Sequence, residues 1–282
     1  MRWKSGRRSD NIEDRRSGSG MGGPAKVGGV GLILMLVVAW LMGADTMQLL
    51  GIAGSNLVGT TMTVQAPTAE EQEDADFISA VVAQTEDVWG PMFQAAGKTY
   101  KEPHLVLFTE QIESACGYAS AASGPFYCPA DQKVYIDLSF FPELRRLGAP
   151  GDFARAYVIG HEIAHHVQNQ LGTSSKVSRL QSQVSEADSN SLSVLLELQA
   201  DCYAGVWAHH AEKTFKVLET GDVEEGLKAA SAIGDDRLQK MSGRRVNPDA
   251  FTHGTSEQRV KWFRTGLEYG DMNRCDTFAS IR

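Results

Sequence analysis

The motif HEIAH at residues 161–165 constrains this chain more than any other feature of its sequence. Uncharged residues flank the motif at helical spacing and Gly172 follows it, so we expect a helix over residues 152–170. Residues i and i+4 lie on one face of a helix, and the side chains of His161 and His165 can therefore reach a single metal ion. Glu162 lies about 100° further round the helix, where it can contact water at that ion without being a ligand.

A catalytic metal site of this kind needs a third protein ligand. A third histidine on the same stretch would occupy position 171, but this chain has Leu171 there. The best candidate is Glu197, a single acid within the apolar segment LLELQAD, and Asp201 follows one helical turn later. Because a metal-bound histidine usually donates its second N–H to a carboxylate or a carbonyl, we expect Asp201 to accept from His161. Four other residues stay open as ligands in place of Glu197: Glu186, Asp188, His209 and His210.

Two imidazoles, one carboxylate and an open fourth position form a ligand set typical of catalytic zinc. We therefore expect one Zn²⁺ per chain, with Glu162 as the general base that activates water. Such chemistry also needs a hydrogen-bond donor for the tetrahedral oxyanion. His253, beside Gly254 and just before a predicted helix, is our candidate for this catalytic role, and Tyr157 and Tyr203 are alternatives.

Charge is distributed unevenly along the chain. The formal net charge of the 282 residues is −8, yet residues 1–26 carry seven Lys or Arg against three Asp or Glu. The rest of the chain is therefore strongly acidic. Phosphate binding requires a basic surface, so this charge balance argues against nucleic acid as a partner.

An uncharged, apolar run separates Lys26 from Asp45. Two interpretations compete for it, an uncleaved membrane anchor over residues 27–44 and a cleaved secretory signal. The long head and the poor cleavage site favour the anchor, and the positive-inside rule then places the basic head in the cytoplasm. The sequence thus predicts a single-pass protein of the inner membrane, with a cytoplasmic head (1–26), a transmembrane anchor (27–44), a linker (45–67) and an extracytoplasmic domain (68–282).

The chain has four cysteines, at positions 116, 128, 202 and 275, and none of them forms a C-x-x-C pair. An even number in an exported domain favours two disulfides, although buried free thiols are the alternative. Three pairings are open. We favour Cys116–Cys128, which closes a short loop, and Cys202–Cys275, which ties the C-terminal tail to a helix.

The remaining pattern predicts an α+β domain that is mainly helical with a small β-sheet. Thr68 and Glu71 form a capping-box signal for a helix that extends to about residue 96. Alternating or apolar runs predict strands over 104–109 and 133–138, with a loop over 116–130 between them. The second strand is a candidate edge strand for an extended peptide. Further helices are expected over 192–218, 222–241 and 256–269, with a polar, mobile connection over 174–190.

Several segments together resemble one bacterial family, the neutral zinc metallopeptidases or YpfJ-like proteins. They are the head RWKSGRRSDNIEDRR, the loop CGYA followed by GPFYCPAD, the strand VYIDL, the helix GHEIAHHVQ, and the segments ELQADCYAGVW and HGTSEQRVKWF. The resemblance covers nearly the whole chain and shows no departure at His161, His165 or Glu197. It implies a membrane-anchored, zincin-like peptidase domain that acts on peptides or proteins.

The sequence therefore predicts a zinc-dependent metallopeptidase, most simply an endopeptidase, at the cell envelope. A membrane-tethered zinc-binding adaptor without turnover is the alternative, but such a protein has no need of a base at Glu162. An exported zinc hydrolase with a substrate other than peptides ranks last. No sequence feature predicts the peptide specificity or the oligomeric state.

Overall fold

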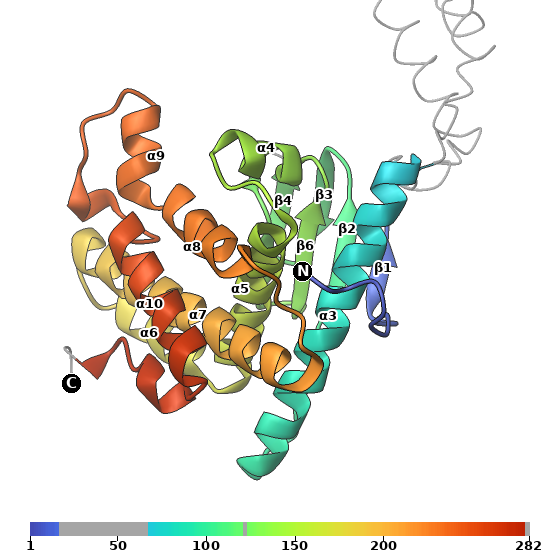
Figure 1. Cartoon of the computed structure of the whole chain (residues 1–282). Helices are drawn as coiled ribbons and strands as arrows, with labels where there is room; N and C mark the ends of the chain where they lie inside the picture. The colour runs from blue at the N-terminus through green and yellow to red at the C-terminus, as the bar shows by residue number, and fades with distance from the viewer. Residues whose placement is uncertain (17–66, 121–122, 280–282) are drawn as a thin grey trace, which may run out of the picture. The chain divides into compact units, whose positions relative to one another are not determined.

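The computed structural model describes residues 1–16, 67–120 and 123–279 (Figure 1). Residues 1–16 and the chain from Thr68 onward form one folded unit. The unit is mainly helical with a small sheet, which confirms the predicted α+β class. The predicted anchor at residues 27–44 lies outside the described residues, as does nearly all of the predicted linker. Among the helices that are described, none is both long and apolar enough to cross a bilayer.

The main sheet has four strands in the order β1-β2-β6-β5. β2 pairs in parallel with β1 and with β6, whereas β5 runs antiparallel to β6. β6 is thus an interior strand, and the prediction that residues 133–138 form an edge strand was wrong. The edge strand next to β6 is β5, which lies within the segment 116–130 that was predicted to be a loop. A separate hairpin joins β3 to β4. The strand bounds are β1 Ile12–Asp14, β2 His104–Phe108, β3 Gln111–Ser114, β4 Gly117–Ser120, β5 Phe126–Cys128 and β6 Lys133–Asp137.

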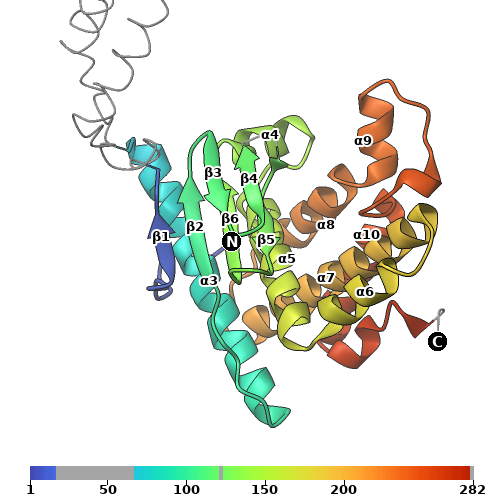
Figure 2. The same cartoon turned by 180° about the vertical axis from the view of Figure 1, so that it is seen from behind.

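The helices begin and end close to the predicted positions where local signals are strong. The capping box of Thr68 and Glu71 starts α3, whose buried face contacts α5 and α7 (Figures 1 and 2). α5 has the predicted bounds, and Gly172 follows it in the left-handed conformation at φ 78°. The helix bounds are α3 Ala69–Ala95, α4 Phe140–Arg146, α5 Asp152–Gln170, α6 Thr173–Gln181, α7 Glu186–Phe215, α8 Asp222–Ala232, α9 Asp235–Met241 and α10 Ser256–Tyr269, with short 3₁₀ turns η2 Pro248–Ala250 and η3 Met272–Cys275.

Two helix predictions were wrong. The segment expected as a mobile connection, 174–190, contains α6 and the first turn of α7, which Ser185 caps by accepting a hydrogen bond from the Asp188 N–H. The single helix expected over 222–241 is two helices, α8 and α9, separated at Gly234. A Cβ atom at Gly234 would lie 2.4 Å from the Ser256 nitrogen, so the chain passes too close to α10 for any larger residue.

Close backbone contact sets the spacing of the helices that carry the site. A Cβ atom at Gly266 of α10 would lie 1.9 Å from the Cys202 carbonyl oxygen of α7. On α5, a Cβ atom at Gly160 would lie 2.7 Å from the ring of Trp207, which is fully buried. These small residues let α5, α7 and α10 approach one another closely, and side chains from all three helices meet beside His161.

The leading segment is part of the folded unit, not a separate head. β1 pairs with β2, Trp3 packs edge-on against Phe77 of α3 at a centroid distance of 5.4 Å, and Arg7 forms an ion pair with the buried Glu86. Of its basic residues, Lys4 and Arg7 pair with acids of α3. Arg15 and Arg16 pair instead with Glu13 and Asp14 of the segment itself. The separation of residues 1–16 from the domain was therefore wrong.

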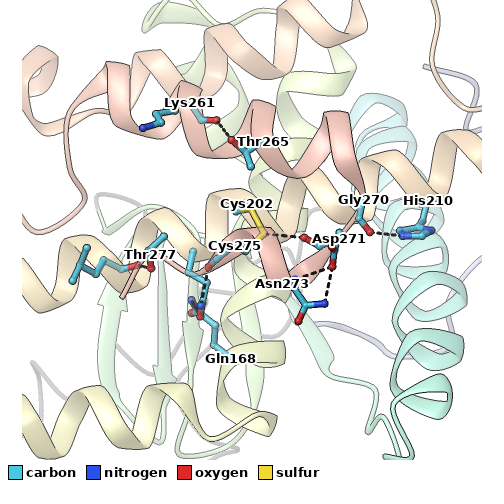
Figure 3. Close-up of a disulfide and its surroundings, with 12 residues drawn as sticks. Gln168, Cys202, His210, Lys261, Thr265, Gly270, Asp271, Asn273, Cys275 and Thr277 are labelled. Carbon is cyan, nitrogen blue, oxygen red and sulfur yellow. Dashed lines mark hydrogen bonds between the residues drawn. A yellow bond between two sulfur atoms is a disulfide. The ribbon is translucent and has the colours of Figure 1, made fainter. Parts of the chain in front are cut away.

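Both favoured disulfides are confirmed. Cys116–Cys128 joins the turn between β3 and β4 to the edge strand β5. Cys202–Cys275 joins α7 to η3, as Figure 3 shows. The second bond lies directly after Asp201 in the chain, and Gln199 donates a hydrogen bond to the Cys275 carbonyl oxygen at 3.1 Å. The C-terminal segment is thereby fixed against the part of α7 that carries Glu197 and Asp201.

Candidate metal centre

His161, His165 and Glu197 converge at one point between α5 and α7. The Nε2 atoms of His161 and His165 are 3.2 Å apart. The carboxylate of Glu197 lies 3.1 Å from the Nε2 atom of His161 and 3.3 Å from that of His165. The structure thus joins the three predicted ligands, although 32 residues separate Glu197 from His165 along the chain.

Contacts at the other ring nitrogens fix which atoms face the centre. The Nδ1 atom of His161 lies 2.9 Å from Asp201 Oδ1, and the Nδ1 atom of His165 lies 2.9 Å from Gln168 Oε1. Gln168 is held in this orientation because its Nε2 group donates to the Leu196 carbonyl oxygen at 2.7 Å. With a proton on each Nδ1 atom, as these acceptors favour, both Nε2 atoms would present lone pairs to a metal ion at the centre.

Three acceptors that face one another repel unless a cation lies between them. In a tetrahedral zinc site with bonds of about 2.0–2.1 Å, neighbouring ligand atoms are about 3.3 Å apart. The two Nε2 atoms are 3.2 Å apart, and each lies 3.1–3.3 Å from one of the two carboxylate oxygens of Glu197, which is close to that spacing. The donor set, two neutral imidazoles and one carboxylate, is also that of catalytic zinc. These residues therefore fit a zinc ion.

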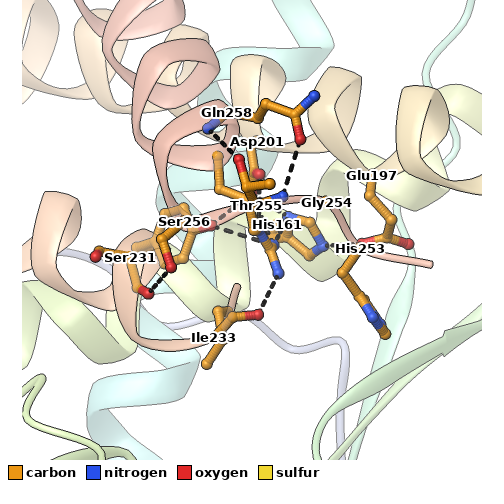
Figure 4. A network of polar contacts seen from close by, with 12 residues as sticks. His161, Glu197, Asp201, Ser231, Ile233, His253, Gly254, Thr255, Ser256 and Gln258 are labelled. Atoms are coloured by element: carbon orange, nitrogen blue, oxygen red, sulfur yellow. Dashed lines mark hydrogen bonds and ion pairs between the residues drawn. The ribbon is translucent and has the colours of Figure 1, made fainter. Parts of the chain in front are cut away.

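A buried network of charged side chains contacts His161 at its Nδ1 atom, away from the metal centre (Figure 4). Asp201, which is fully buried, accepts two hydrogen bonds of 2.9 Å from the guanidinium group of Arg259 on α10. It also accepts from the Tyr157 hydroxyl. The predicted role of Asp201 beside His161 is thus in place. The sequence analysis missed Arg259. A signal was present, because Arg259 precedes the buried Phe263 by four residues and therefore lies on the apolar face of α10.

Electrostatics in this network favour ionised carboxylates. Burial raises the pKa of Glu197, but the two imidazoles lower it by more, so it lies well below its usual range. Burial also raises the pKa of Asp201, while Arg259 and His161 lower it overall. For His161, burial lowers the pKa, yet Asp201 and Glu197 raise it to about 10. In the metal-free protein a proton therefore competes for the position that a cation takes, and metal binding releases that proton.

Glu162 follows His161 on α5 and lines the same cleft, which has a volume of about 520 Å³. Its side chain is 8% exposed, so the carboxylate is accessible only from the cleft. One wall is formed by residues 123–127 and Pro129 around the edge strand β5. The rest of the lining combines the metal-site residues with the apolar side chains of Phe140, Val158, Leu196, Ile233 and Leu238.

His253 also lines this cleft, from the loop before α10. Its Nδ1 atom lies 3.2 Å from Asp235 Oδ1. The other oxygen of Asp235 accepts hydrogen bonds from the backbone N–H groups of Thr252, His253 and Gly254 at 2.7–3.0 Å. The hydrogen bond with Asp235 raises the pKa of His253. The predicted donor is thus held at the rim by an acid that the sequence analysis did not single out.

The other candidates lie away from the centre. His209 and His210 contact the Leu267 and Gly270 carbonyl oxygens at the end of α10. Glu186 and Asp188 lie in the first turn of α7. The Tyr157 hydroxyl is bonded to Asp201, and Tyr203 packs against Trp89, so neither tyrosine belongs to the cleft.

Comparison with known proteins shows the family of this chain. The sequence profile of a family described as "Putative neutral zinc metallopeptidase" matches residues 1–278. The chain belongs to this family. "Uncharacterized protein YpfJ" of Escherichia coli (strain K12) is 49% identical over 284 residues, which cover 99% of each chain. "Uncharacterized protein Rv2575" of Mycobacterium tuberculosis (strain ATCC 25618 / H37Rv) is 44% identical over 205 residues, which cover 68% of this chain and 67% of that protein. No solved structure matches the chain.

This membership confirms the resemblance drawn from the sequence motifs. The family description supports zinc and peptide hydrolysis in general terms. The matched range includes residues 1–16, which the structure places in the same folded unit as α5 and α7. The zincin-like fold stays a prediction.

Proposed function

We propose that this protein is a zinc-dependent endopeptidase. The observation that carries the proposal is the convergence of two imidazole lone pairs and the Glu197 carboxylate within 3.1–3.3 Å of one another, beside a general-base candidate in a cleft. A site that only bound zinc for stability would have four protein ligands and would be closed to solvent. Three ligands at the wall of a cleft support catalysis instead.

His161, His165 and Glu197 would hold the ion. Zinc in that position supplies a Lewis acid that polarises a scissile carbonyl and acidifies water. Glu162 takes the proton from the attacking water and delivers it to the leaving amine. His253 donates a hydrogen bond to the oxyanion from the rim of the cleft, and Asp235 keeps the imidazole oriented. Asp201 and Arg259 do not touch the substrate; they hold His161 with its Nε2 lone pair toward the ion.

The edge strand β5 supplies a place for the peptide backbone. Its residues 126–127 line the cleft, and its free edge can pair with an extended substrate and fix its register. The apolar residues in the lining of the cleft suit an uncharged side chain next to the scissile bond. Arg259, the one Lys or Arg among the described residues that line the cleft, is paired with Asp201, so it does not select for a terminal carboxylate. These features favour internal peptide bonds over chain ends.

We also propose that the folded unit works on the extracytoplasmic side of the inner membrane, since its two disulfides require an oxidising compartment. A single membrane crossing at residues 27–44 would put residues 1–16 and the domain on opposite sides of the membrane. Because residues 1–16 fold together with the domain, we propose that both lie on the extracytoplasmic side. Thiol alkylation of the protein taken directly from cells, with and without reductant, tests the compartment. Four thiols that react without reductant would contradict it.

The decisive experiment compares the wild-type chain with Glu162→Gln. Peptide cleavage, measured by proteomic cleavage profiling, should fall by about 10²–10⁴-fold because the general base is lost. Zinc content should stay at one ion per chain, since Glu162 is not a ligand. The matched control Glu257→Gln removes an exposed glutamate from α10 and should change neither quantity. Full cleavage activity in Glu162→Gln would contradict the mechanism. A wild-type protein that binds zinc but cleaves no peptide would favour the alternative of a zinc-binding adaptor without turnover.

A further inference from the structure

A second cluster of acids surrounds the first turn of α5, the helix that carries His161 and His165. Asp152, Asp222 and Glu225 place carboxylate oxygens within 4.8 Å of one another. Asp222 is only 4% exposed. Three like charges at this separation repel one another and are costly to bury without a cation. We call this cluster the acidic pocket.

The α-ammonium group of Met1 occupies the acidic pocket. Its nitrogen lies 2.6 and 2.7 Å from the two carboxylate oxygens of Asp152. It also lies 3.4 Å from the nearest carboxylate oxygen of Asp222 and 3.4 Å from that of Glu219. The Met1 side chain belongs to the hydrophobic core, and the residue is 7% exposed. The group is thus a buried cation with a bidentate partner.

The adjoining residues hold Met1 in this position. The Arg2 N–H donates to the Val217 carbonyl oxygen at 2.7 Å, and the Arg2 guanidinium donates to the Leu218 carbonyl oxygen at 2.7 Å. Trp3 is buried against Phe77. These contacts fix the direction from which the chain enters the acidic pocket, and they leave the amine nitrogen directed at Asp152.

The acidic pocket is also the N-terminal end of the metal-binding helix. Asp152 is the first residue of α5, and Glu225 accepts a hydrogen bond from the Phe153 N–H at 3.1 Å. Gly151 permits this arrangement, because a Cβ atom there would lie 2.0 Å from the Glu225 carboxylate carbon. The start of α5 is therefore defined by two acids, and the ammonium group neutralises part of their charge.

We propose that the acidic pocket is a binding site for the free α-amino group of Met1, and that this ion pair fixes the start of the metal-binding helix. Acylation of the amine replaces the ammonium with a neutral amide and leaves the acids uncompensated. Residues placed ahead of Met1 have the same effect, since the amide occupies the position of the charge. The N-terminal amine is thus a modification-sensitive element of the fold, and this role does not depend on catalysis.

The test compares two forms of the full chain, both tagged at the C-terminus. One begins at Met1, with the free amine verified by intact mass, and the other carries Gly-Ser ahead of Met1. The extended chain should have a lower thermal midpoint, by about 10 °C, as expected when one partner of a buried ion pair is removed. Equal midpoints would overturn the proposal.

A double-mutant cycle separates charge from simple steric disruption. Asp152→Asn should lower the midpoint of the chain that begins at Met1, because it weakens the pairing of the ammonium. In the extended chain the same substitution should be neutral or stabilising, because it removes an uncompensated carboxylate. The control Glu224→Gln, an exposed acid of α8, should have no effect in either form. The same loss from Asp152→Asn in both forms would refute the pairing. A cellular protein whose N-terminus is not Met1, either because it lacks that residue or because it carries others ahead of it, would also overturn the proposal.

Discussion

The metal centre and the acidic pocket are two clusters of the same helix with opposite chemistry. In each, three candidate ligand atoms lie within 4.8 Å of one another. The metal centre combines two neutral imidazoles with one carboxylate, whereas the acidic pocket has only carboxylates. Nitrogen lone pairs oriented by hydrogen bonds favour zinc, while an all-carboxylate cluster favours a hard or organic cation. The acidic pocket already holds one, the α-ammonium of Met1. Proximity of ligands alone therefore does not identify a metal site.

The two clusters also differ in which residues hold their side chains in place. Behind the metal centre, a buried arginine holds a buried aspartate, which holds His161. Around the acidic pocket, the support comes from the first residues of the chain, which reach it across more than 150 positions of sequence. The first arrangement orients a ligand, and the second compensates charge at a helix terminus. Substitutions in the two clusters should therefore affect different measurements.

The largest difference should come from removing one carboxylate from each cluster. Glu197→Ala takes away a metal ligand, so zinc content after dialysis and peptidase activity should both fall to background. Glu225→Ala removes an acid of the acidic pocket and should leave zinc content at one ion per chain. Metal analysis of both variants measures this contrast directly. Zinc retained by Glu197→Ala would show that another residue is the third ligand.

The next effect concerns the rim of the cleft. His253→Ala should lower kcat by about 10²–10³-fold, the usual result of removing an oxyanion donor, with little change in KM. Asp235→Asn should reduce kcat less, since it only loosens the orientation of His253. Zinc content should be unchanged in both. A change in KM alone would assign His253 to substrate binding instead.

Arg259→Met should weaken zinc affinity by about 10–100-fold, as is typical when the group that orients a ligand is lost. It also leaves Asp201 buried without its main counter-charge, which should cost about 3–5 kcal/mol of stability. Competition with a chelator and chemical unfolding measure the two effects. The control Arg264→Met removes an exposed arginine one position after Phe263 and should alter neither. Normal zinc affinity in Arg259→Met would limit Arg259 to a structural role.

The smallest effect is the pH dependence of the ion pair in the acidic pocket. Burial lowers the pKa of the Met1 amine, but Asp152 and Asp222 raise it overall above 8.0. The ion pair thus contributes its full stability below about pH 8, the pKa of an unfolded α-amine, and loses it as the pH rises through the folded value. The groups that face the amine are Asp152, Glu219, Asp222 and Glu225.

Unfolding of the metal-free protein between pH 7 and 10 measures this dependence together with that of His161, whose pKa is raised to about 10 and which is the same in the wild-type chain and in Asp152→Asn. The Asp152→Asn variant should show a weaker decline over the same range, because its amine has lost its principal partner. Parallel curves for the two proteins would assign the alkaline decline to other groups.

By itself, the sequence determined the features that depend on neighbours within a helical turn. The spacing of His161 and His165, the capping box at Thr68 and the bounds of α5 and α10 were predicted, because the period of a helix fixes which side chains share a face. Glu197 and both disulfides were also predicted, from an isolated acid among apolar residues and from cysteine spacing.

Only the tertiary structure decided which distant charges meet. Arg259 reaches Asp201 because Gly266 lets α10 approach α7, and β5 became the edge strand because β6 pairs on both sides. The basic residues before position 17 gave a local pattern that fits a membrane-flanking head equally well. Two of them, Lys4 and Arg7, pair with Glu73, Glu86 and Asp87 of α3. A local pattern carries no information about such distant partners. Long-range packing therefore determined the place of the N-terminal amine.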